Sequence, residues 1–218
     1  AYRKKECLGV PFFSVIRSMH RFSMYLLLLI GLAACKEEDE NEVIPDTVTA
    51  QVEYPRYGKE VDVQINGLTF DAMEPFISPD GTTLFFNNLN DGINTRIFYA
   101  SRIDDSTFSF QGELDGTNQN VNPQLNAVPD LDAQGNFYWT SPRDYPNQLD
   151  NLFYGKYASG IVRDSGRLRG DFNLKLPGWL VMDHGISYDG QFLYFNNARF
   201  DNVNCQGPCE TRLGIAQK

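Results

Sequence analysis

The stretch Pro75-Phe-Ile-Ser-Pro-Asp-Gly-Thr-Thr-Leu-Phe-Phe-Asn-Asn88 recurs near the end of the chain as His184-Gly-Ile-Ser-Tyr-Asp-Gly-Gln-Phe-Leu-Tyr-Phe-Asn-Asn197. A degenerate third copy lies between them, Pro129-Asp-Leu-Asp-Ala-Gln-Gly-Asn-Phe-Tyr-Trp-Thr-Ser141. Internal repeats have to be recognised before any fold is assigned, because the period decides the architecture. The central glycines Gly81, Gly135 and Gly190 give a period of about 54 residues.

Each copy has the pattern of a β-hairpin. Asp-Gly between apolar runs predicts a two-residue turn of the primed type, because glycine and aspartate tolerate a positive φ. The strand after the turn is apolar without alternation, which indicates that both of its faces are covered. These apolar runs are 84–86, 137–139 and 193–195.

A second marker keeps step with the first. Thr95-Arg-Ile-Phe-Tyr-Ala-Ser-Arg102 is followed by Asn151-Leu-Phe-Tyr-Gly-Lys156 and by Thr211-Arg-Leu-Gly-Ile-Ala-Gln-Lys218. These stretches predict third strands at 97–99, 152–154 and 213–215. Alternation at Phe108-Ser-Phe110 and over 172–176 predicts fourth strands. Four strands in each unit, without a helical pattern, is typical of a β-propeller blade.

The first copy resembles the Pro-Asp type of WD-like β-propeller repeat found in TolB and in many bacterial envelope proteins. The resemblance covers roughly residues 60–218, although Ala133-Gln134 and Tyr188 depart from the Pro-Asp pattern. It implies an all-β propeller of four-stranded antiparallel blades. Six blades would need roughly 330 residues, so we expect about three blades in residues 51–218, an incomplete propeller with further blades beyond Lys218. A small closed β-sandwich is the alternative if the repeats are coincidental.

The N-terminal part of the chain differs in character. Residues 1–18 precede the first methionine and are interpreted as translated upstream sequence or an expression remnant. Residues 19–34 combine a short basic flank, an apolar run and small residues, which is typical of a secretory signal peptide. Leu32-Ala-Ala-Cys35 resembles the lipobox of bacterial lipoproteins, which implies lipidation of Cys35. The alternative is an ordinary signal peptide with a chance cysteine. Residues 35–50, rich in acids, are then a lipidated tether.

Charge and the lipobox narrow the function classes. The net charge is −9 and no basic stripe is present, which argues against nucleic-acid partners. We therefore expect an outer-membrane lipoprotein of the bacterial cell envelope, periplasmic or surface-exposed. It would be attached to the membrane through Cys35 and bind an envelope protein or glycan.

Loops at the start of the first strand and after the second strand of each copy are expected to open on one funnel face. Polar side chains that converge on a rigid scaffold are typical of binding sites. The predicted ligand-binding residues are Glu74, Asn87, Asn88, Arg143, Asp183, His184, Asn196 and Arg199. The structural alternative is that the Asn-Asn pairs cap strand ends. Arg143 and Arg199 follow equivalent strands, which favours a shared role in pairing loop carboxylates.

No catalytic residue is predicted, although two enzyme classes can be compared with the sequence. A Ser-His-Asp hydrolase would need His184, but no nucleophile elbow is present. A glycosidase could draw paired carboxylates from Glu74, Asp132 and Asp183, and this is the alternative to a non-catalytic binding module. No cofactor is expected.

The pair Cys205 and Cys209 lies in a loop of the third copy. The three-residue gap between them is not the Cys-x-x-Cys spacing of zinc or redox sites, and there is no second pair to complete four ligands, so no metal is expected. Outside the cytoplasm a disulfide between the two is the prediction. Free thiols are the alternative.

Overall fold

The computed structural model describes residues 56–119, 124–201, 204 and 207–218. The chain divides into residues 1–57, of which only the last two are described, and residues 58–218, which hold every strand. In these described ranges the protein is all-β without a helix, as predicted. No helix in that part is long and apolar enough to cross a membrane.

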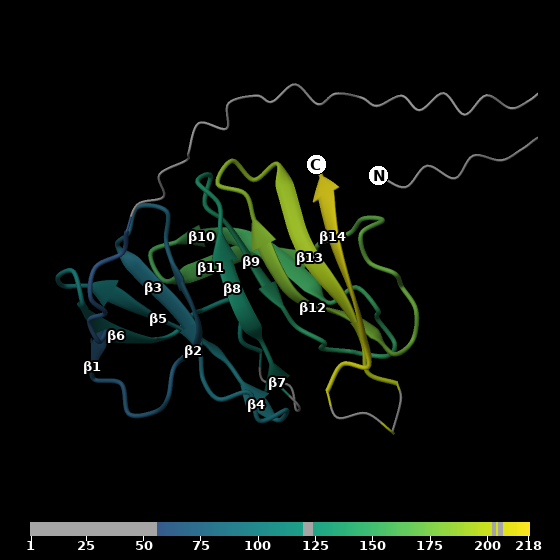
Figure 1. Ribbon diagram of the computed structural model, residues 1–218, viewed down its shortest axis with the longest axis horizontal. Coiled ribbons are helices and arrows are strands. Elements are labelled where there is room, and N and C mark those ends of the chain that lie inside the picture. The colour runs from purple at the N-terminus through teal and green to yellow at the C-terminus, as the bar shows by residue number, and fades with distance from the viewer. Residues whose placement is uncertain (1–55, 120–123, 202–203, 205–206) are drawn as a thin grey trace, which may run out of the picture. The chain divides into compact units, whose positions relative to one another are not determined.

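The three copies of the repeat form three separate sheets (Figure 1). Sheet 1 has the order β1–β6–β5–β3–β2, sheet 2 the order β11–β10–β9–β8, and sheet 3 the order β12–β13–β14. All pairs inside these sheets are antiparallel except β1 with β6. A short parallel pair, β4 with β7, links the first copy to the second.

The strand bounds follow the chain. Sheet 1 contains β1 (Gln64–Asn66), β2 (Met73–Ile77), β3 (Thr83–Asn87), β5 (Ile97–Arg102) and β6 (Thr107–Glu113). Sheet 2 contains β8 (Ala127–Leu131), β9 (Asn136–Thr140), β10 (Leu152–Ala158) and β11 (Ile161–Arg167). Sheet 3 contains β12 (Trp179–Ile186), β13 (Phe192–Arg199) and β14 (Glu210–Gln217). The linking pair is β4 (Asn94–Thr95) and β7 (Gln124–Leu125).

The predicted hairpins are confirmed, but the two-residue primed turn is wrong. In the first copy the Ser78 amide donates to the Thr83 carbonyl, and the Gly81 amide donates to the Ser78 carbonyl. Gly81 alone takes the left-handed conformation in this turn, with φ of 73°. The loop is longer than predicted because side chains satisfy its amides. Asp80 Oδ1 accepts from the Thr82 amide at 3.0 Å, and Ser78 Oγ accepts from the Thr83 amide at 2.9 Å.

The third strands lie where predicted, whereas the fourth strand of the second copy does not. Gly160, with φ of 84°, turns the chain tightly from β10 into β11, so β11 occupies the place that was predicted for 172–176. That segment is irregular, and Phe172 packs edge-on against Phe195 of β13, with ring centroids 5.6 Å apart. The third copy has three strands in the described part of the chain.

The main core lies between sheets 1 and 2. Phe85 and Ile97 of sheet 1 are fully buried against Phe137 and Trp139 of sheet 2. A second core covers the other face of sheet 1, where Phe86, Phe98 and Phe108 pack against Ile65 and Leu68. In the second copy Tyr138, which points to the other face of sheet 2, is also buried, so the apolar second strands of the first two copies have both faces covered, as predicted.

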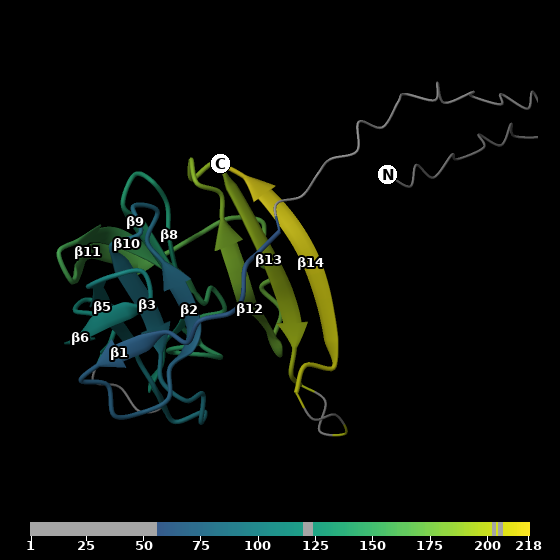
Figure 2. The same ribbon diagram turned by 60° about the vertical axis from the view of Figure 1, so that its left-hand side comes forward.

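Sheet 3 lies beside sheet 2 (Figure 2), where β12 contacts β8 and β9. Its second strand is covered on one face only. Leu193 is buried, but Tyr194, whose side chain points to the opposite face, is 52% exposed. On the neighbouring strand Leu213 and Ile215 share this open face with Tyr194 and are also exposed.

Candidate functional site

The first strand of every copy has a β-bulge at the same repeat position. The pairing register shifts between Met73 and Phe76, between Ala127 and Asp130, and between Val181 and His184. Bulges re-aim side chains and are common beside functional sites. The residues seven before each repeat glycine are Glu74, Val128 and Asp183.

Side chains at these bulges bind the bulge of the next copy. The Val128 amide donates to Glu74 Oε2 at 3.2 Å and to Asn87 Oδ1 at 3.4 Å. Between the second and third copies, Thr140 Oγ1 lies 3.3 Å from His184 Nδ1. Glu74 and Asn87 of the first copy and His184 of the third copy therefore contact the same part of sheet 2, because Thr140 pairs with Ala127 next to Val128. We call Glu74, Asn87, Asp183 and His184 the bulge cluster.

Glu74 is a half-buried carboxyl inside this cluster. Burial raises its pKa above the usual range, hydrogen bonds from Val128 and Asn87 oppose that rise, and the charge of Asp183 adds to it. Glu74 also has a positive φ of 51°, which is uncommon for a residue with a side chain. Asp183 is exposed and accepts from Asn196 Nδ2 at 2.8 Å.

His184 is the neutral member of the bulge cluster. Burial lowers its pKa to about 4, and the backbone carbonyl of Tyr138 opposes that shift only in part. Its Nε2 atom is buried. At pH 7 the imidazole is therefore uncharged, and it links β12 to β9 through Thr140.

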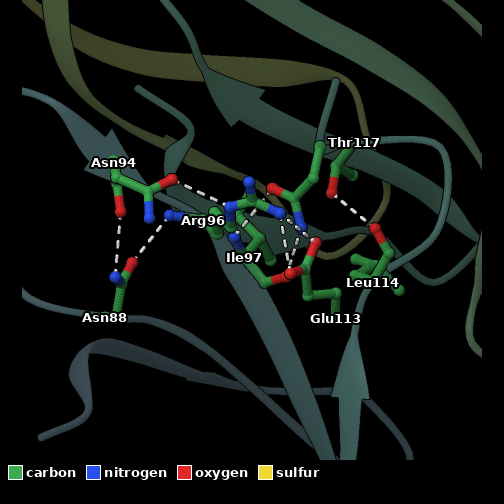
Figure 3. Close-up of polar contacts among 8 residues, drawn as sticks. Asn88, Asn94, Arg96, Ile97, Glu113, Leu114 and Thr117 are labelled. Carbon is green, nitrogen blue, oxygen red and sulfur yellow. Dashed lines mark hydrogen bonds and ion pairs between the residues drawn. The ribbon is translucent and has the colours of Figure 1, made fainter. Parts of the chain in front are cut away.

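The paired asparagines shape loops and bulges. Asn88 Oδ1 accepts from the Arg96 amide at 2.7 Å, and its Nδ2 donates to the Asn94 carbonyl at 2.9 Å (Figure 3). In the third copy, Asn196 Oδ1 accepts from the amides of Met182 and Asp183 at the bulge. These contacts correspond to the strand-capping alternative for the Asn-Asn pairs.

The two predicted arginines have different environments. Arg199 pairs with Asp201 at 3.2 Å and with Glu210 at 3.1 Å. Arg143 instead donates to Ser141 Oγ and to oxygens of Thr117 and Asn126, all uncharged acceptors. Burial, with the nearby charge of Arg167, lowers the pKa of Arg143 to about 10.

The three carboxylates proposed for glycoside hydrolysis are not equivalent. Asp132 lies in the hairpin turn of the second copy, at the end of β8 away from the bulge. Its Oδ1 accepts from the amides of Gln134 and Asn136, and its Oδ2 accepts from Asn136 Nδ2 and the Tyr138 hydroxyl. Only Glu74 and Asp183 belong to the bulge cluster.

The structure also brings in a carboxylate that sequence reasoning missed. Asp130 is 6% exposed in β8, and burial raises its pKa. Its Oδ2 accepts from the Ile186 amide at 2.6 Å, which ties sheet 2 to sheet 3. An alignment of the three copies singles this position out, because Asp130 is a carboxylate where the other copies have Phe76 and Gly185.

The cysteine predictions fall largely outside the described residues. Cys35 and the segments 1–18, 19–34 and 35–50 lie there, as does Cys205. Cys209 is described and is disulfide-bonded, while its pairing with Cys205 stays a prediction. Among the described residues, no group of three or more His, Cys, Asp or Glu is placed to hold a metal ion.

Comparison with protein-family models and with curated proteins gives no match to this chain.

Proposed function

We propose that this chain is a lipid-anchored protein of the bacterial cell envelope that binds a protein or glycan partner on a propeller-type scaffold and catalyses no reaction. The lipobox-like Leu32-Ala-Ala-Cys35 supports the anchor, and the TolB-like repeat supports the scaffold. The observation that carries the binding role is the bulge cluster. It contains polar side chains from the first and third copies, with Asp183 near enough to raise the pKa of Glu74, and we call the surface around these residues the rim.

Two features support a propeller arrangement of the sheets. The first strands of consecutive copies are neighbours, since β8 contacts both β2 and β12, as the inner strands of adjacent blades do. The open face of sheet 3 carries Tyr194, Leu213 and Ile215. Their counterparts in sheet 1 are Phe85, Ile97 and Tyr99, which pack against sheet 2.

The rim is suited to binding because it is preorganised. Asp183 is held by Asn196, and the Glu74 carboxyl is held by the Val128 amide. Met182 and Asp183 remain exposed at this rim. A rigid polar surface loses little conformational entropy when a partner docks.

Membrane fractionation tests the anchor. Cys35→Ser removes the acylated thiol and is expected to release the protein into the soluble fraction. Membrane association that survives the substitution would refute the anchor.

Retention of the protein on immobilised envelope glycans and surface proteins tests whether the rim binds a partner. Asp183→Asn removes an exposed charge there and is expected to weaken retention. Asp105→Asn is the matched control, because Asp105 is exposed in a turn of sheet 1. Equal retention of both variants and the unmodified protein would argue against a partner at the rim.

The second candidate is a carbohydrate-active enzyme. A carboxyl whose pKa is raised by burial and by the charge of a second carboxylate is typical of a general acid and its partner, and the half-buried Glu74 with Asp183 has this form. Turnover of a plant or algal polysaccharide that is lost in Glu74→Gln or Asp183→Asn would establish this enzyme and refute the binding-only role.

A further inference from the structure

A cleft of about 1160 Å³ lies between sheets 2 and 3, apart from the bulge cluster. One wall is formed by β9, β10 and the segment after β11, and the other by β12, β13 and β14. Its volume is slightly above that of typical ligand pockets. No residue of the bulge cluster lines it.

Basic residues are concentrated in this cleft although the chain is acidic. The lining includes Arg167, Arg169, Arg212 and Lys218, against the single acid Asp171, while the whole chain has a net charge of −9. Such local segregation of charge attracts an anionic ligand.

The arginines differ in how available they are to a ligand. Arg167 lies over the Phe153 ring, on the face of sheet 2 that packs against sheet 1, and donates to the Asp150 and Arg143 carbonyls and to Asp144. Arg212 lies over the Trp179 ring, and only its Nε and Nη2 donate to Glu210, so it retains donors for a ligand. Arg169 is exposed, and no hydrogen bond or ion pair engages it within the described part of the chain.

An unpaired buried acceptor lines the same cleft. Asn197 is 3% exposed, and its Nδ2 donates to the Phe172 carbonyl at 2.9 Å. Its Oδ1 is buried and has no partner among the described residues. A buried acceptor without a donor is costly, and a ligand hydroxyl would satisfy it.

The side chains of the walls favour a sugar ring. The backbone groups of β9, β10 and β13 are engaged on both sides in the sheets, whereas β14 is an edge strand with one row of backbone groups open, so an extended acidic peptide is the competing ligand. The walls present aromatic side chains, among them Tyr154 and Phe195. Flat apolar faces, guanidinium groups and an amide acceptor together match a ring with hydroxyl and carboxylate substituents.

We propose that this cleft binds an acidic oligosaccharide that contains uronate residues. Arg169 and Arg212 bind the ligand carboxylates, Tyr154 packs against a sugar ring, and Asn197 accepts from a hydroxyl. This inference rests on the proposed binding function and names its ligand class, at a site separate from the rim.

Calorimetric titration of the full chain in detergent tests the proposal. The probe is a tetrasaccharide of galacturonic acid, with the neutral galactose tetrasaccharide and a tetraglutamate peptide as comparisons. We expect binding of the uronate alone, weakened by salt. Arg169→Glu is expected to lower the affinity at least tenfold, because a charge-assisted hydrogen bond is replaced by repulsion. Arg163→Glu, exposed on β11 outside the cleft, is the matched control and should bind as the unmodified protein does.

The outcomes separate the proposals. No uronate binding, or binding that Arg169→Glu and Tyr154→Ala leave intact, overturns the cleft site. Equal binding of tetraglutamate overturns the sugar class in favour of acidic peptides. If the uronate tetrasaccharide does not bind but retention on envelope material depends on Asp183, the proposed function stands and only the cleft site is refuted. If both assays fail, both proposals fall.

Discussion

Among single residues, the bulge positions show how one repeat site serves different purposes. Glu74 and Asp183 supply carboxylates, whereas Val128 supplies only a backbone amide, which Glu74 and Asn87 bind. The residue after Asp183 is His184, which is neutral because its ring is buried. A charged imidazole there would lose most of its hydration without gaining a carboxylate partner among the described residues.

We predict that His184 makes stability fall as the solution becomes acidic. Its pKa is about 4 in the folded chain, below the ordinary value of about 6.5 in an unfolded chain. Between these values the unfolded chain binds more protons, so the stabilisation is complete above about pH 6.5 and is lost as pH falls toward 4, by up to about 3 kcal/mol.

NMR of the imidazole protons checks this prediction. In a His20→Gln background only His184 contributes, and its resonances should titrate near pH 4. His184→Gln should lose less stability than the unmodified protein between pH 7 and pH 4.5. Titration near pH 6.5 would contradict the assignment of a buried, neutral imidazole.

Among the structural elements, the hairpin turns resemble one another in geometry but differ in chemistry. Copies one and three use a serine and an aspartate, with Ser78 Oγ donating to Asp80 at 2.5 Å and Ser187 Oγ donating to Asp189 at 2.6 Å. In the second copy a single buried side chain, Asp132, satisfies the turn. That turn is one residue shorter, because the Asp132 amide donates to the Asn136 carbonyl.

Removing these turn side chains is expected to have unequal effects. Ser78→Ala deletes one acceptor and one donor and should lower the free energy of unfolding by about 1 kcal/mol. Asp132→Ala leaves buried donors unsatisfied and should cost about 3 kcal/mol. Denaturant unfolding measures both, with Ser165→Ala on an exposed strand position as the control. Equal losses in the two variants would contradict the division of roles.

Across the molecule as a whole, burial is unequal along the repeat. Sheets 1 and 2 share a core, and the other face of sheet 1 is closed by Ile65 and Leu68. Sheet 3 joins sheet 2 through polar contacts such as Asp130 with the Ile186 amide and Asn151 with Val181. The other face of sheet 3, which carries Tyr194, Leu213 and Ile215, is open.

Two equivalent positions test this difference directly. Ile97 pairs with Asn87 in sheet 1 and is fully buried, while Leu213 pairs with Asn196 in sheet 3 and is 88% exposed. Ile97→Ala should lower the free energy of unfolding by about 2–5 kcal/mol through lost burial and a cavity. Leu213→Ala should change it by less than about 0.5 kcal/mol.

Chemical denaturation of both variants provides the measurement, and each is the other's control. A large loss on Leu213→Ala would mean that the open face of sheet 3 is covered in the folded protein, as further blades or a partner would cover it.

The order of residues was enough to predict the period, the three hairpins and the third strands, because turn residues and apolar runs act over a few neighbouring positions. The fourth strand at β11 was missed, since the alternation at Phe172 competed with the tight turn at Gly160. Only the packed sheets showed that Glu74 binds the Val128 amide, that Asp132 is buried in a turn and that Arg143 has uncharged partners. These contacts depend on how separate sheets pack, which the local pattern of a repeat does not specify.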